Sequence, residues 1–111
     1  TLWKISSDGN KQKQITGHHE NFYRHLALSP DGSMLVYAVL ENKYLGIWAI
    51  PAEGGKSLPL SITHKSHNEG MNWSPDGKQI AFTSTRSGNF DIWLMDVDID
   101  QLKKELLEIN E

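Results

Sequence analysis

Short runs of apolar residues recur along this chain, and turn-forming residues separate them. Between residues 22 and 62 the runs are FYRHLALS (22–29), MLVYAVL (34–40), LGIWAI (45–50) and SLPLSI (57–62), with SPDG, ENKY and PAEGGK in or between them. In SPDG, Pro30 sets the backbone for the second position of a turn, and Gly32 is free to take a positive φ. Runs of this length between turn signals predict four antiparallel strands joined by tight turns.

The whole series repeats with a spacing of 45 residues. Trp3, Trp48 and Trp93 share one position of the repeat, and the SPDG sequences at 29–32 and 74–77 share another. The register holds without a gap from residue 2 to about residue 97. A fixed period in the forties built from short strands is typical of the blades of a β-propeller. We therefore predict an all-β protein, a β-propeller segment made of four-stranded antiparallel blades.

The strand count gives a little over two blades. Residues 1–16 supply the last two strands of an incomplete blade, 17–62 a complete blade, and 63–97 three strands of the final blade. Runs such as MLVYAVL and IWLM (92–95) are apolar throughout, which indicates burial on both faces of each sheet, with Trp48 and Trp93 between blades. Closed propellers have about four to eight blades, so the segment is expected to come from a larger ring. Alternatively, it self-associates through its open blade faces.

The repeat ends before the final blade is complete. At about 102–107, where the period would place a fourth strand, the sequence reads LKKELL. Asp98 and Gln101 resemble a helix N-cap and its third-position partner. Ile99, Leu102, Leu106 and Ile109 fall on one helical face. We predict a short C-terminal α-helix within 98–111, with the outer strand of the last blade supplied by the N-terminus of the parent chain. This expectation places the segment at the parent's C-terminal end.

The composition excludes several classes of function. The chain has 111 residues, 38% hydrophobic and 23% charged, which suits a soluble globular protein. A net charge of −3 gives no basic stripe for a nucleic acid, and no apolar run approaches the roughly 20 residues of a membrane span. The absence of cysteine excludes disulfides and thiolate metal sites. The chain starts inside a strand-like pattern, at TLWKI, rather than with a signal-peptide pattern, so we expect it to be a fragment of a longer protein.

One part of the repeat resembles a known family. The pattern W-SPDG-K-x-I-A-F-x-S-x-R-x-G, followed by D-I-W-x-M-D, is similar to the TolB-like family of WD-repeat-like β-propellers. The similarity is strongest over 68–96, weaker over 21–55, where ENKYLG replaces the S-x-R-x-G hairpin, and a trace over 2–16. The resemblance implies a six-bladed parent and an extracytoplasmic, periplasmic location in a bacterium. It also implies a scaffold that binds partner proteins of the cell envelope.

The alternative is an accessory propeller of a serine peptidase or another hydrolase, because similar repeats occur in such proteins. Its catalytic domain would lie outside this stretch. The chain has no G-x-S-x-G elbow and no Gly-rich loop before a helix, so neither a nucleophile nor a phosphate site is predicted. The serines and aspartates of the SPDG turns are interpreted as structural. We therefore expect no enzyme activity and no cofactor.

The remaining chemistry lies in two histidine-containing loops, GHHEN and THKSHNEG, which join the outer strand of one blade to the inner strand of the next. His64 and His67 with Glu69 offer metal ligands, but polar loop residues in solvent explain them more simply, and no metal site is predicted. Such loops contact partner proteins in scaffold propellers. The candidate partner-binding residues are His18, His19, Asn21, Tyr23, Arg24, His64, His67, Asn68 and Glu69.

Overall fold

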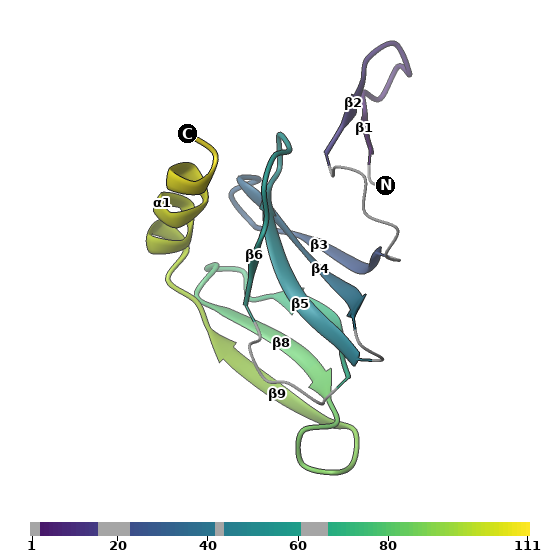
Figure 1. The fold of residues 1–111 in the computed structure, drawn as a ribbon, viewed down its shortest axis with the longest axis vertical. Coiled ribbons are helices and arrows are strands. Elements are labelled where there is room, and N and C mark those ends of the chain that lie inside the picture. The colour runs from purple at the N-terminus through teal and green to yellow at the C-terminus, as the bar shows by residue number, and fades with distance from the viewer. Residues whose placement is uncertain (1–2, 16–22, 42–43, 61–66) are drawn as a thin grey trace.

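The computed structural model describes residues 3–15, 23–41, 44–60 and 67–111. In chain order these contain β1 (Trp3–Ile5), β2 (Gln12–Gln14), β3 (Tyr23–Leu28), β4 (Met34–Glu41), β5 (Tyr44–Pro51), β6 (Leu58–Pro59), β7 (Asn68–Trp73), β8 (Gln79–Ser84), β9 (Asp91–Asp96) and α1 (Ile99–Ile109). The strands form three antiparallel sheets, in the orders β1-β2, β3-β4-β5-β6 and β7-β8-β9 (Figure 1). The predicted β-rich fold of antiparallel sheets with a C-terminal helix is confirmed.

The four-stranded sheet is a simple meander in which each strand pairs with the next along the chain. β4 pairs with β5 from Met34 opposite Pro51 to Glu41 opposite Tyr44. β6 is shorter than the predicted run, because only Leu58–Pro59 form a strand, pairing with Trp48 and Ala49 of β5. The pairing of β3 with β4 is displaced between residues 24 and 27. That of β7 with β8 is displaced between 69 and 72, which are the corresponding positions of the sequence repeat.

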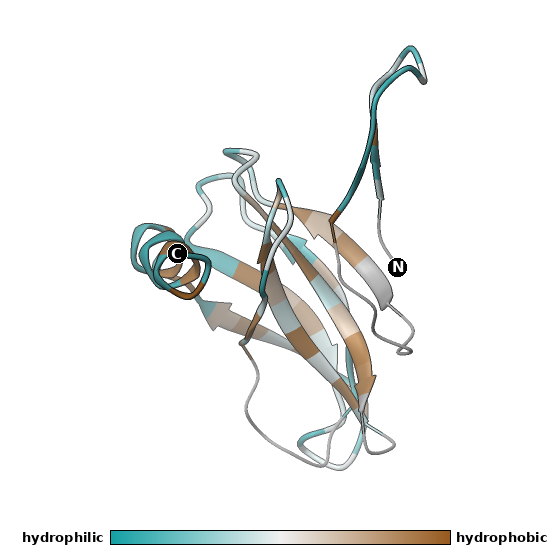
Figure 2. Cartoon of the chain, turned by 45° about the horizontal axis from the view of Figure 1, so that its top comes forward, coloured by the Kyte–Doolittle hydropathy of each residue, from teal (hydrophilic) through white to brown (hydrophobic). Residues whose placement is uncertain are grey.

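The main hydrophobic core lies between the four-stranded and three-stranded sheets. Alternate residues of β4 and β5 point toward it, and β3 lies beside β7. Apolar residues along the strands of both sheets are visible in Figure 2. The buried residues of the main core are Met34, Val36, Ala38, Leu45, Ile47, Ala49, Met71, Ile80, Phe82, Leu102 and Leu106. The opposite face of the four-stranded sheet buries Tyr37, Val39 and Ile50 against Ile15, which follows β2. Both faces of β4 are therefore covered, as its apolar sequence predicts.

The two SPDG sequences form turns with matching hydrogen bonds. Ser29 Oγ donates to Asp31 Oδ1 at 2.7 Å, and the amide of Met34 donates to Ser29 Oγ at 3.1 Å. Gly32 has a φ of 75°, which a residue with a Cβ rarely adopts. Ser74, Asp76 and Gly77 repeat these features. The serine and aspartate side chains thus complete the turns, which supports their structural interpretation.

A third turn of the same kind joins β1 to β2, and the sequence pattern did not reveal it. Ser6 Oγ donates to Asp8 Oδ1 at 2.6 Å, the amide of Lys11 donates to Ser6 Oγ at 3.0 Å, and Gly9 has a φ of 77°. Ser7 occupies the place of proline. The turn therefore depends on the serine, aspartate and glycine, while the proline is dispensable.

The turn after β5 contacts both the β1–β2 hairpin and α1 at its two consecutive glycines, Gly54 and Gly55. A Cβ on Gly54 would lie 3.1 Å from the carbonyl oxygen of Ile15, on the side of the β1–β2 hairpin. A Cβ on Gly55 would lie 2.2 Å from Oδ1 of Asn110, at the end of α1. Both glycines have positive φ angles, 98° and 124°. The missing side chains therefore allow the hairpin and the helix to approach the same turn from opposite sides.

The C-terminal helix packs across the edge of the core. Asp98 caps it by accepting a hydrogen bond from the amide of Gln101 at 3.1 Å, as predicted. Leu102 and Leu106 are buried in the main core, and Ile99 and Ile109 pack against it. The predicted apolar stripe is therefore the face that contacts the sheets. Where the repeat would place a fourth strand, the chain is helical.

The outermost strand of the three-stranded sheet departs from the expected burial. Within the described residues β9 pairs only with β8. Ile92 is 78% exposed, Leu94 64% and Trp93 37%, whereas Ile47 and Ala49, at the positions of Ile92 and Leu94 in the preceding repeat, are fully buried. Trp93 lies on the other face of β9, opposite the core residue Phe82, and is only partly buried. Ile92 and Leu94 are exposed because no described element covers the outer face of β9.

Candidate protein-interaction surface

The structure places the predicted partner-binding residues in three groups. His18, His19, Asn21 and His64 lie outside the described residues. Tyr23 and Arg24 are the first residues of β3, and Glu69 is the second residue of β7, so these three belong to strands rather than to loops. His67 lies immediately before β7 and Asn68 begins it. The described part of the predicted surface therefore centres on His67 and Asn68.

His67 connects three segments at this end of the sheets. Its ring lies against Tyr44, the first residue of β5, with a centroid separation of 5.5 Å and an angle of 46° between ring planes. Its amide donates to Thr85 Oγ1 at 2.9 Å, and the amide of Thr85 donates to the His67 carbonyl at 3.1 Å. The segment entering β7 is therefore fixed to the turn that leaves β8.

Asn68 is 1% exposed, so its side chain lies within the protein rather than on its surface. Its Nδ2 donates to the carbonyl of Leu45, in β5, at 2.9 Å. Its Oδ1 accepts from Nη2 of Arg86 at 3.1 Å. A buried amide requires such partners, because each unmade hydrogen bond costs about 1–3 kcal/mol. Asn68 thereby links the four-stranded sheet to an arginine of the neighbouring sheet.

Arg86, in the turn between β8 and β9, is held by four neighbours. Its Nε donates to the buried Ser84 Oγ at 3.0 Å, and Asn68 accepts the bond from Nη2. The guanidinium also lies over two rings, 5.0 Å from the centroid of Phe82 and 5.4 Å from that of Trp93, within the range of cation–π attraction. We call Asn68, Phe82, Ser84, Arg86 and Trp93 the arginine cluster. It presents a fixed positive charge beside a partly exposed indole.

The sequence-based candidates include His67 and Asn68 but not their neighbours Tyr44, Arg86 and Trp93. Signals for two of them were present. Arg86 belongs to the S-x-R-x-G hairpin, and Tyr44 belongs to ENKY, the corresponding hairpin one repeat earlier. These hairpins lie at the same end of the sheets as the segment that enters β7.

The carboxylates with lowered pKa values belong to the turns. Ser6 and the amide of Asn10 lower the pKa of Asp8, and Ser74 and the amide of Lys78 lower that of Asp76, by hydrogen bonding to the carboxylates. The ammonium group of Lys103, 2.5 Å from Asp31, holds the pKa of that carboxyl well below its usual range, with help from Ser33 and Ser29. These carboxylates stabilise turns and α1. In the described part of the chain, His, Asp and Glu form no group that would hold a metal ion.

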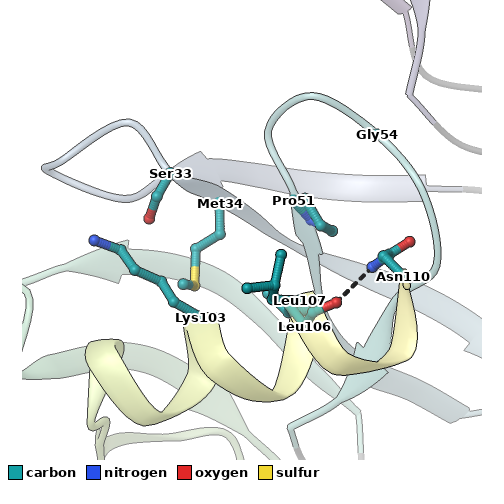
Figure 3. Close-up of a pocket in the computed structure, with 8 residues that line it drawn as sticks. All are labelled: Ser33, Met34, Pro51, Gly54, Lys103, Leu106, Leu107 and Asn110. Atoms are coloured by element: carbon teal, nitrogen blue, oxygen red, sulfur yellow. Dashed lines mark hydrogen bonds between the residues drawn. The ribbon is translucent and has the colours of Figure 1, made fainter.

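A small pocket lies between α1 and the turn after β5, separate from the arginine cluster (Figure 3). Its volume is about 210 Å³, below the roughly 300–1,000 Å³ of typical small-molecule sites. Its polar groups already have protein partners, since Lys103 pairs with Asp31, and Asn110 Nδ2 donates to the carbonyl of Leu106. The lining residues are Ser33, Met34, Pro51, Gly54, Lys103, Leu106, Leu107 and Asn110. We interpret this pocket as the packing seam of the helix.

Comparison with solved structures identifies the architecture. A protein assigned as TolB from Agrobacterium tumefaciens matches 86% of this chain with a TM-score of 0.72 and 27% sequence identity. The chain has a TolB-like fold. TolB from Acinetobacter baumannii matches 81% of the chain with a TM-score of 0.63 and 23% identity. The chain spans 34% and 22% of the lengths of these proteins.

Comparisons of the sequence alone find no match. No protein-family model matches the chain, and no curated protein matches it. Among the described residues no helix is long and apolar enough to cross a membrane; α1 has eleven residues and two faces of different polarity.

Proposed function

We propose that this chain is a non-catalytic β-propeller segment of a TolB-like protein and acts as a scaffold for protein–protein interaction in the bacterial cell envelope. In this proposal the four-stranded sheet is a complete blade, and the three-stranded sheet is a final blade without its outer strand. The β1–β2 hairpin supplies the last two strands of an incomplete blade. The TolB-like fold and the spacing of 45 residues in the sequence support this assignment. By the same resemblance, the protein works in the periplasm.

The observation that carries the proposal is the construction of the surface around His67. Residues of β5, of the segment before β7 and of the β8–β9 turn meet there, and hydrogen bonds hold them to two sheets. Rigid strands that fix a set of aromatic, polar and cationic side chains at one end form a suitable surface for a protein partner, because little conformational freedom is lost on binding. Tyrosine, tryptophan and arginine are also the residue types that contribute most to protein interfaces.

Site-directed photo-crosslinking in bacterial cells tests the proposal. A photoreactive phenylalanine derivative replaces Tyr44, at the surface, or Lys78, an exposed residue at the opposite end of the three-stranded sheet. We expect a discrete protein adduct after illumination of the Tyr44 derivative and none from the Lys78 derivative. Equal labelling at both positions, or no adduct at Tyr44 in cells that express the folded protein, would contradict the proposal.

The exposed side chains of β9 extend the proposal to assembly. Ile92 and Leu94 leave an apolar face and a free strand edge, which is an arrangement that pairs with another chain or sheet. We propose that the isolated chain self-associates through this face. Sedimentation of the chain beside an Ile92→Lys variant tests this, because a charge on the face should favour the monomer. Identical sedimentation of both proteins as monomers would exclude it.

A further inference from the structure

The guanidinium of Arg86 is preorganised, and its charge is not neutralised within the described part of the chain. An arginine has five N–H donors, and two of them are used here, by Ser84 and Asn68. Both acceptors are neutral and buried, so they fix the guanidinium without cancelling its charge. No carboxylate among the described side chains lies within ion-pair distance of it.

The repeat itself does not require this cluster. One period earlier, the positions of Asn68, Ser84 and Arg86 carry Tyr23, Val39 and Glu41. In the sheet β3–β6 the position of Arg86 carries the opposite charge, and Glu41 is the last residue of β4, paired with Tyr44, rather than part of a longer turn. The polar cluster is therefore a local feature of the three-stranded sheet, which the preceding repeat does not share.

The chemistry of the cluster indicates what binds there. A fixed guanidinium binds a carboxylate through two parallel hydrogen bonds and loses little side-chain freedom in doing so, because its rotamer is already set. Trp93 is 37% exposed beside it and offers apolar contact area next to the charge. A carboxylate with a neighbouring apolar side chain matches both features.

We propose that the arginine cluster recognises a carboxylate on a peptide segment of the protein partner, with Arg86 as the contacting group and Asn68 and Ser84 as positioning residues. The inference rests on the proposed function, since it names the chemistry that the partner presents to this surface. The carboxylate belongs either to an acidic side chain or to a chain terminus, and both present the same group to the guanidinium.

Nuclear magnetic resonance of the labelled chain, with short peptides as probes, tests the inference. The first probe is Gly-Glu-Leu-Gly with both ends blocked, the second is blocked Gly-Gln-Leu-Gly, and the third is Gly-Gln-Leu-Gly with a free C-terminal carboxylate. We expect saturable shifts of the Arg86 Nε–H and Trp93 indole signals with a dissociation constant on the order of millimolar. Such shifts with the first probe assign an acidic side chain as the ligand, and such shifts with the third assign a terminus. The second probe, which has no carboxylate, should produce no saturable shift of either signal.

Three variants test the role of Arg86, one of which, Lys78→Gln, is the charge-matched control. Arg86→Gln should weaken binding about tenfold or more, because a charge-assisted pair is lost. Lys78→Gln removes the same charge at the other end of the sheet and should leave the affinity unchanged within about twofold. Arg86→Lys keeps the charge without the planar fork and should bind more weakly than the unmodified chain. It also serves as the test variant if Arg86→Gln does not fold.

Equal shifts with the glutamate and both glutamine probes, or equal loss of affinity in Arg86→Gln and Lys78→Gln, would overturn the inference. So would the absence of any shift at Arg86. These outcomes leave the proposed scaffold function standing if the Tyr44 derivative still forms its adduct in cells. Loss of that adduct with intact carboxylate binding would instead reject the scaffold role and retain the chemistry of the cluster.

Discussion

The docking of α1 on the sheets can be tested with two adjacent leucines. Leu106 is 3% exposed and belongs to the main core, whereas Leu107 is 67% exposed. Replacing either with alanine removes the same atoms from the same helix and changes helix propensity equally. The difference between the two variants therefore measures the burial of Leu106 against the sheets and little else.

The expected magnitude follows from what Leu106 contacts. Leucine to alanine removes apolar volume worth about 0.8 kcal/mol for each buried carbon, or roughly 2.4 kcal/mol for three carbons. A rigid cavity would add to this, with observed costs of about 2–5 kcal/mol for such substitutions. Leu106 also lines the pocket beside the helix, so part of its surroundings is already open. We expect a loss of about 2–3 kcal/mol in the free energy of unfolding for Leu106→Ala.

Urea unfolding, followed by tryptophan fluorescence and by circular dichroism, measures this loss. Leu107→Ala should change the free energy of unfolding by no more than about 0.5 kcal/mol. If Leu106→Ala releases only the helix, the helical signal should be lost at lower urea than the fluorescence change. Equal effects of Leu106→Ala and Leu107→Ala on the midpoint and on the helical signal would refute the packing described here.

Three further substitutions test other parts of the structure. Trp93→Ala should destabilise the chain by about 1–2 kcal/mol in thermal unfolding, less than the roughly 3–5 kcal/mol of a fully buried tryptophan, because its ring is partly exposed; a larger loss would show that β9 is covered in solution. Gly55→Ala should lower the melting temperature more than Gly9→Ala, because both glycines have positive φ but only a Cβ on Gly55 meets the end of α1. Equal decreases would contradict the close contact between α1 and the turn after β5. Asp31, whose pKa is lowered chiefly by Lys103, should add stability above pH about 4 that disappears as the pH falls. Asp31→Asn should therefore reduce the difference between urea midpoints at pH 7 and pH 3, by less than about 1 kcal/mol because the pair is exposed, and an unchanged difference would exclude this contribution.

The features that could be predicted from the sequence are those with local signals. Strands and SPDG turns follow from short apolar runs and from the conformations that proline and glycine allow. The helix follows from its cap and its apolar stripe, and its contact face was identified correctly because Leu102 and Leu106 share that stripe. The turn at Ser6 has the same hydrogen bonds but lacks the proline, so the SPDG pattern did not predict it.

The features that could not be predicted depend on what lies beside a segment in space. Trp93 has the same sequence context as Trp48, yet β5 has a strand on each side and β9 has a described strand on one side only. Periodicity carries no information about that difference. The arginine cluster arises because the pairing of β7 with β8 places Asn68 opposite Ser84, two residues before Arg86. Positions 68 and 86 are not equivalent in a repeat of 45 residues, so the repeat gave no sign that their side chains lie close together.

The connection between Asn110 and the turn after β5 has a consequence for the order of synthesis. The amide of Lys56 donates to Asn110 Oδ1 at 2.6 Å, and Asn110 Nδ2 donates back to the Lys56 carbonyl at 3.2 Å, across a sequence separation of 54 residues. The strands pair with their immediate neighbours in the chain, so each sheet can form as soon as its own hairpins have left the ribosome. The helix that covers Met34 is made after every strand described here. During translation this edge of the core therefore stays open until α1 has been made, which is the interval in which a chaperone or a neighbouring nascent chain would encounter it.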